Sequence, residues 1–257
     1  MKKETDLSDR MKDYEMRQDE MLLKRIPVII RLDGKSFHTF TRKMVRPFDD
    51  DVLLQAMRNT MLRLCQNIQG TVFGYTQSDE ITLVLVDYDE LDKVPWFDYR
   101  VQKLCSLSAA MATLYFNQEF AKLTDEKYGS SESEEAAFYQ KSKWQAMFDA
   151  RAYNVPMDDV NNLLHWRQLD AEKNSVNNLA RCYFKDKELV KKSMSDRINM
   201  LLEKKVNWFE IPTRFKRGTC AIKVAENGDV EKSKWKIDLD PPRFVKEPDY
   251  ARSKFVF

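Results

Sequence analysis

Several features that define common protein classes are scarce in this sequence. No stretch approaches the roughly 20 consecutive apolar residues of a membrane span, and the charged residues 1–20 lack the apolar core of a signal peptide. The formal net charge is only +2, so binding to nucleic acid would depend on local basic patches. We therefore expect a soluble cytoplasmic protein. The cysteines are far apart and form no C-x-x-C spacing, which favours reduced thiols over a zinc site: Cys65, Cys105, Cys182 and Cys220.

The chain nevertheless has ample material for a hydrophobic core, because 257 residues can form one large domain or two small ones. An apolar run over residues 26–32 predicts a strand, and two β-branched and aromatic runs, 71–76 and 81–86, predict a largely buried β-hairpin. With two helices and a fourth strand at residues 145–153, the predicted order is β-α-β-β-α-β. This order is typical of an α+β, ferredoxin-like fold, in which an antiparallel sheet carries two helices on one face.

We expect residues 1–155 to form the catalytic region, with residues 156–257 as a mainly helical region integrated into the same domain. Residues 1–20 are predicted to form a helix folded against the body, and the polar residues 125–135 a mobile loop. The other expected elements are helices at 157–164, 170–183 and 188–204, and a hairpin of 219–224 and 234–237 turning at Asn227-Gly228.

Acidic residues end two of the predicted strands. Asp33 follows the first strand, and the hairpin tip contains Ser78, Asp79 and Glu80 but no Gly or Asn for a tight primed turn, which favours a chemical role. If the first strand lies beside the hairpin, Asp33 and Asp79 meet at one edge of the sheet. Oxygen ligands without a cysteine cluster suit Mg²⁺ rather than Zn²⁺. The alternative is that each Asp caps a turn. Glu80, adjacent in sequence, is expected to support the two aspartates and not to bind the cation directly.

The loop after Asp33 is a candidate anion site. Residues 34–38 can direct successive backbone N–H groups at a phosphate, although they are not a Walker A motif, because the first glycine and its spacer are missing. His38, one of only two histidines, either contacts a phosphate or base or is a capping or core histidine.

Two further segments have both a structural and a functional interpretation. Trp166 begins a stretch dense in polar residues, including Asn174, which is either a solvated helix face or a recognition surface. The basic run Arg214-Phe215-Lys216-Arg217 is either a solvated loop or a contact with a nucleic-acid backbone.

Four motifs together resemble the histidine-tRNA guanylyltransferase family. They are Arg31-Leu32-Asp33-Gly34-Lys35-Ser36-Phe37-His38, Gly74-Tyr75-Thr76-Gln77-Ser78-Asp79-Glu80, Trp166-Arg167-Gln168 and Lys216-Arg217-Gly218. The resemblance implies a polymerase palm-like domain that adds nucleotides in the 3′-to-5′ direction, usually as a homotetramer. It implies two Mg²⁺ ions held by Asp33, the Gly34 carbonyl and Asp79.

The sequence departs from the motif pattern of this family at one place. Family members that add a guanosine to histidine tRNA carry His-Ile-Asn-Asn soon after Trp-Arg-Gln, whereas residues 170–175 here read Asp-Ala-Glu-Lys-Asn-Ser. This resembles the guanylyltransferase-like branch, whose members are similar to template-dependent enzymes that repair tRNAs truncated at the 5′ end.

We therefore expect a nucleotidyltransferase that extends the 5′ end of tRNA with ATP and GTP as substrates. The alternatives are addition of a single G to histidine tRNA, a palm-type nucleotide cyclase and a non-catalytic RNA-binding module. Catalysis is assigned to Asp33, Asp79 and Glu80. Nucleotide binding is assigned to Asp33, Gly34, Lys35, Ser36, Phe37, His38, Ser78 and Asp79, with phosphate contacts from Arg31 and Arg46. Contacts with tRNA are assigned to Arg167, Asn174, Arg214, Lys216 and Arg217.

Overall fold

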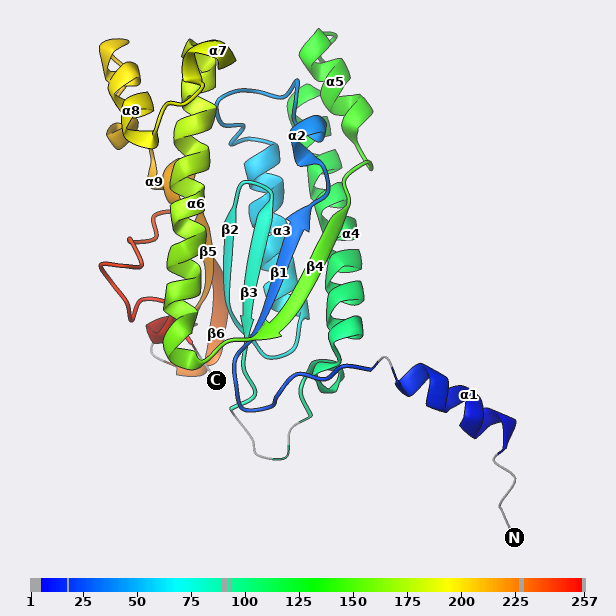
Figure 1. Ribbon diagram of the computed structural model, residues 1–257. Coiled ribbons are helices and arrows are strands. Elements are labelled where there is room, and N and C mark those ends of the chain that lie inside the picture. The colour runs from blue at the N-terminus through cyan, green and yellow to red at the C-terminus, as the bar shows by residue number, and fades with distance from the viewer. Residues whose placement is uncertain (1–5, 18, 89–91, 93, 227–228, 256–257) are drawn as a thin grey trace.

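The computed structural model describes residues 6–17, 19–88, 92, 94–226 and 229–255, and its centre is a six-stranded antiparallel sheet (Figure 1). The strand order is β4-β1-β3-β2-β5-β6. The strands are β1 (Val28–Gly34), β2 (Thr71–Gln77), β3 (Glu80–Leu85), β4 (Phe148–Asn154), β5 (Thr219–Glu226) and β6 (Asp229–Asp238).

Helices cover both faces of this sheet (Figure 1). The first four strands with α3 and α4 form the predicted β-α-β-β-α-β order, so the α+β fold class is confirmed. None of the described helices is long and apolar enough to cross a membrane. The helices are α1 (Leu7–Met16), α2 (Phe37–Phe40), α3 (Leu53–Asn67), α4 (Val101–Tyr128), α5 (Glu134–Ser142), α6 (Met157–Tyr183), α7 (Asp186–Leu189), α8 (Met194–Glu203) and α9 (Thr213–Arg217).

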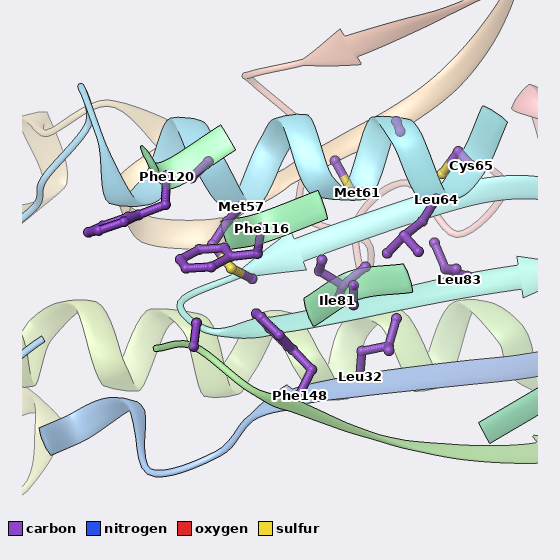
Figure 2. Packing of buried hydrophobic residues seen from close by; sticks show 14 of the residues in the cluster. Leu32, Met57, Met61, Leu64, Cys65, Ile81, Leu83, Phe116, Phe120 and Phe148 are labelled. Carbon is purple, nitrogen blue, oxygen red and sulfur yellow. The ribbon is translucent and has the colours of Figure 1, made fainter. Parts of the chain in front are cut away.

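The main core lies between the sheet and the helices α3 and α4 (Figure 2). Alternate residues of β1, Val28, Ile30 and Leu32, point into it, because successive side chains of a strand face opposite sides. On the other face Ile29, with side chains from β2 and β3, packs against α6. This alternation also determines where the charged residues of β1 lie, because Arg31 and Asp33 share the α6 face with Ile29.

Five expectations are corrected or limited by the structure. The helix expected at 188–204 is divided into α7 and α8, with residues 190–193 between them. Residues 157–183 form one continuous helix, α6, instead of two. Residues 125–135 are mostly helical, because α4 continues to Tyr128 and α5 begins at Glu134. The helix α1 projects from the body and has no buried residue; Leu7, for example, is 62% exposed. The predicted turn at Asn227-Gly228 lies outside the described residues, whereas β5 and β6 on either side of it pair as expected.

The strands β5 and β6 also extend the sheet of the first four strands, since β5 pairs with β2. The division of the chain at residue 155 remains a prediction. A small third cluster, including Val176, Leu201 and Trp208, joins the C-terminal half of α6 to α7 and α8.

Candidate active site

The two predicted acidic residues come together at the end of the central strands. Asp33 lies near the end of β1, and Asp79 lies in the two-residue turn between β2 and β3. The Gly34 amide donates a hydrogen bond of 3.0 Å to the Asp79 carbonyl, which ties the two segments together. β1 and β3 are direct neighbours in the sheet, so the prediction that the first strand lies beside the hairpin is confirmed.

The hairpin tip has a strained backbone. Ser78 adopts a φ of 50°, a left-handed conformation that costs a residue with a Cβ about 1 kcal/mol or more. The Ser78 hydroxyl donates a hydrogen bond of 2.9 Å to Oδ1 of Asp79 and so orients that carboxylate. A turn that keeps Ser and Asp where Gly or Asn would be easier is consistent with a functional role for both side chains.

Burial and charge act on both carboxyl groups. Burial raises the pKa of Asp79; the hydrogen bond from Ser78 lowers it, and the nearby Asp33 carboxylate raises it. Burial also raises the pKa of Asp33; the Asp149 carboxylate raises it further, and the Arg31 guanidinium opposes this. Among the described residues, no cluster of three or more His, Cys, Asp or Glu side chains is arranged to hold a metal ion. Any cation here would therefore need the two carboxylates together with other oxygen donors.

The loop after Asp33 is held by the sheet and by an aromatic anchor. The Lys35 amide donates to the Met147 carbonyl at 2.8 Å. The amides of Gly34 and Lys35 are therefore both engaged within the protein, which corrects the expectation that successive amides from residue 34 onward face a phosphate. Ser36 is left-handed, with a φ of 55°. The Phe37 ring is buried in the main core against Phe148, with ring centroids 5.2 Å apart, and therefore anchors the loop to this core.

A cavity of about 630 Å³ opens beside the two acidic residues, within the size range of small-molecule sites. Its walls come from the loop after β1, the hairpin tip, α6 and α9. Basic and acidic side chains both line it: Asp33, His38, Arg46, Asp49, Asp79, Arg181 and Arg214. Arg31 and Lys35 are not among the residues that line this cavity.

One wall of the cavity was only partly predicted. Asn174, assigned to tRNA, lines the cavity together with Asn177, Asn178 and Arg181. These residues recur at three- to four-residue intervals along α6, a spacing that places them on one helix face and that would have identified Arg181. A second unpredicted feature is the stack of Phe48 on Phe215, with ring centroids 4.8 Å apart.

Glu80 is not among the residues that line the cavity. It lies opposite Asp33 in the sheet, and its carboxylate pairs with Arg167 of α6 at 2.9 Å. Both side chains are 9% exposed, so this is a buried ion pair. Burial raises the pKa of Glu80 despite the opposing effect of Arg167. Arg167 thus joins α6 to the sheet, and its contact with tRNA remains a prediction.

The residues of the basic run have partners within the protein. The Arg214 guanidinium pairs with Asp50 at 2.9 Å, and Lys216 is buried with its ammonium group on the Phe209 carbonyl at 2.7 Å. Arg217 pairs with the buried Glu172 at 2.8 Å. Of these three basic residues, Arg214 lines the cavity. Their contacts with tRNA also remain predictions.

An antiparallel palm-like sheet with two carboxylates beside a cavity of this size is an arrangement suited to nucleotidyl transfer. The family model described as "Thg1: tRNAHis guanylyltransferase" matches residues 8–156, and the chain belongs to this family. It is therefore a nucleotidyltransferase of the guanylyltransferase type.

Relatives support this assignment along nearly the whole chain. A bacterial tRNA(His) guanylyltransferase (Thg1)-like protein in complex with ATP has a TM-score of 0.83 and 38% identity, over 98% of this chain and 100% of that one. A similar bacterial protein in complex with GTP has a TM-score of 0.72 and 35% identity, over 96% and 97% of the two chains. A probable tRNA(His) guanylyltransferase of Dictyostelium discoideum is 27% identical over 92% of this chain and 95% of its own length.

Proposed function

We propose that this protein adds nucleotides to the 5′ end of tRNA in the 3′-to-5′ direction, with the opposite strand of the acceptor stem as template. The observation that carries the proposal is the convergence of Asp33 and Asp79 at the edge of the cavity of about 630 Å³. ATP would first adenylylate the 5′-monophosphate and release pyrophosphate. The 3′-hydroxyl of the incoming nucleotide would then attack that phosphate and displace AMP. Pyrophosphate would be removed from the new 5′ end.

The cavity supports the binding of a nucleoside triphosphate. Bacterial proteins of similar fold are described in complex with ATP and with GTP. His38, Arg46 and Arg214 supply positive or hydrogen-bonding groups to the cavity wall, which suits three phosphates. Base choice would come from pairing with the template strand, so the protein side chains need only hold the sugar and the phosphates.

The donor set suits Mg²⁺. Asp33 and Asp79 would hold the metal with the Gly34 carbonyl, because hard oxygen donors are its preferred ligands. A cation would also offset the burial and the Asp33 repulsion that raise the pKa of Asp79. When bound, Mg²⁺ would activate the attacking hydroxyl and neutralise charge on the triphosphate. The residues themselves orient the donors: Ser78 fixes the Asp79 carboxylate, and the buried Phe37 ring fixes the loop.

The departure at residues 170–175 has a structural counterpart that favours repair over addition of a single G. Glu172, within this stretch, is buried and accepts hydrogen bonds from Arg217 at 2.8 Å and Arg243 at 3.1 Å. A carboxylate engaged in this way is not available to recognise a particular tRNA. By the same resemblance we propose a homotetramer, which light scattering would test.

The test is incubation with a 5′-truncated, 5′-monophosphorylated tRNA, ATP, Mg²⁺ and one nucleotide at a time, with products resolved on a gel. We expect stepwise extension only by the nucleotide complementary to the template. Addition of G alone to full-length histidine tRNA would instead support the guanylyltransferase activity. No extension of either RNA, with turnover of free triphosphate, would favour a cyclase.

A second prediction concerns Gly34, whose missing side chain leaves room for Phe37. A Cβ at position 34 would lie 2.3 Å from the Phe37 ring, so Gly34→Ala must displace either the ring or the loop. We expect nucleotide addition to fall about 100-fold, since a shift of about 1 Å at a reacting centre can have that effect. Stability should fall by about 1–3 kcal/mol, measured by urea unfolding. Adding Phe37→Leu should restore part of the activity; additive losses would contradict this explanation.

A further inference from the structure

The α6 face of the sheet is only partly covered. In Figure 1, α6 crosses one side of this face, and no other described helix lies over β1 and β4 there. Asp149 and Arg151 of β4 are exposed on this open part, and Trp166 at its border with α6 is 51% exposed. None of the three lines the nucleotide-sized cavity.

Two like-charged pairs lie next to each other on this open surface. Arg31 of β1 is directly opposite Arg151 of β4, and Asp33 is directly opposite Asp149. Opposite residues of an antiparallel pair present their side chains on the same face, and like charges there are destabilising. The guanidinium groups of Arg31 and Arg151 both act on the pKa of Asp33, so the two pairs are electrostatically close.

Within the described part of the chain, the basic pair interacts with the Asp33 carboxylate only through the electric field and makes no ion pair with it. Neither Arg31 nor Arg151 has a hydrogen bond or an ion pair with a described residue; Arg31 lies over the Trp166 ring, 5.6 Å from its centroid. Two adjacent arginines whose guanidinium groups make no hydrogen bond to a protein carboxylate keep their donors for an external anion, and their fork geometry suits phosphate.

Trp166 adds a flat aromatic surface to this site. The Arg167 guanidinium lies 3.4 Å from the Trp166 ring centroid, and Arg167 is itself fixed by its buried pair with Glu80. The indole is therefore held in place while half of the residue stays exposed. An exposed, rigid tryptophan beside unpaired arginines is the usual combination for stacking on a nucleic-acid base.

We propose that Arg31, Arg151 and Trp166, the "arginine strip", bind the open end of base-paired RNA. The 5′-phosphate would lie between the arginines and the terminal base pair on Trp166. This inference rests on the proposed function and deepens it. The cavity on one side of Asp33 accommodates the triphosphate, so the second substrate must reach the same carboxylates from another side. The arginine strip is contiguous with Asp33 in the sheet and lies outside that cavity.

The test is equilibrium binding, measured by fluorescence anisotropy with the Asp79→Asn protein so that no turnover occurs. The probes are a 5′-monophosphorylated RNA hairpin with an open end and a closed dumbbell RNA with the same stem. We expect the hairpin to bind about tenfold more tightly, since stacking on one base is worth about 1–3 kcal/mol. Trp166→Ala should abolish this preference, and Trp166→Phe should retain most of it.

Arg151→Gln should weaken hairpin binding about tenfold and reduce the slope of log affinity against log salt by about 1, as expected for one lost phosphate contact. Lys122→Gln, an exposed lysine on α4 on the other side of the sheet, is the matched control and should change neither the affinity nor the end preference. ATP and GTP affinity should stay unchanged in Arg151→Gln.

Three results would overturn the proposal: equal binding of hairpin and dumbbell, an Arg151→Gln protein that behaves like Lys122→Gln, or weakened triphosphate binding in Arg151→Gln. Because binding is measured without turnover, these outcomes are independent of the extension assay. Failure to extend any RNA would count against the proposed function alone, and loss of end preference would count against the arginine strip alone.

Discussion

Asp79→Asn should lower 5′ extension of tRNA by about 1000-fold or more while leaving the protein folded. If Asp79 holds Mg²⁺ as we propose, losing its carboxylate would remove several kcal/mol of transition-state stabilisation, and each 1.4 kcal/mol is a factor of ten in rate. The fold should not suffer, because burial and the Asp33 carboxylate already make the charge of Asp79 unfavourable, as its raised pKa shows. Single-turnover extension and thermal unfolding would be measured on the same preparations.

Metal binding provides a readout of this variant that does not depend on activity. Mg²⁺ should raise the melting temperature of the wild-type protein, because a ligand that binds only the folded state stabilises it, and this increase should be much smaller in Asp79→Asn. Asp240→Asn, an exposed acid in the segment after β6, serves as the matched control and should behave like wild type. Full activity of Asp79→Asn would refute the assignment of this residue.

Arg167→Met should destabilise the protein by about 3–5 kcal/mol, because it leaves the Glu80 carboxylate buried without its partner. The same change removes the cation that packs on the Trp166 ring. Urea unfolding followed by circular dichroism would give the free energy of unfolding. The effect should be largest in the contact between α6 and the sheet.

The double variant Arg167→Met, Glu80→Gln separates the buried charge from the lost packing. If the uncompensated carboxylate causes the destabilisation, neutralising Glu80 should recover a large part of it. Strictly additive losses in the double variant would show that packing alone is responsible.

The central fold could be predicted because its sequence signals are local. Apolar runs that end at Asp33 and at the hairpin tip specify strands, and the order of elements restricts how those strands pair. The continuous helix α6 was divided in the prediction because its middle contains Arg167, Gln168 and Glu172 at buried positions. These polar residues can be buried because each has a hydrogen-bond partner, and local sequence does not reveal the partners because they come from distant segments: Glu80, the Pro242 carbonyl, Arg217 and Arg243.

The candidate site was predictable to a similar extent. Asp33 and Asp79 were expected to meet, and the hydrogen bond between Gly34 and Asp79 shows that they do. Local sequence could not indicate that Lys216 turns inward to the Phe209 carbonyl, since a basic run looks alike whether it faces solvent or the protein. The position of Arg31 opposite Arg151 could not be predicted from local sequence either, because it depends on the register between β1 and β4.

The sheet order has a consequence for how this enzyme can move. β1 and β3 lie in the interior of the sheet, each hydrogen-bonded to a neighbouring strand on both sides. Interior strands of this kind open only when most of the domain unfolds. Asp33 lies on such a strand, and the turn that contains Asp79 is hydrogen-bonded to it through Gly34, so we expect both carboxylates to move little. Any rearrangement during the proposed nucleotide addition would therefore come from the RNA, the nucleotide or the surrounding loops. In the proposed reaction the tRNA would move relative to Asp33 and Asp79, and the two carboxylates would stay in place.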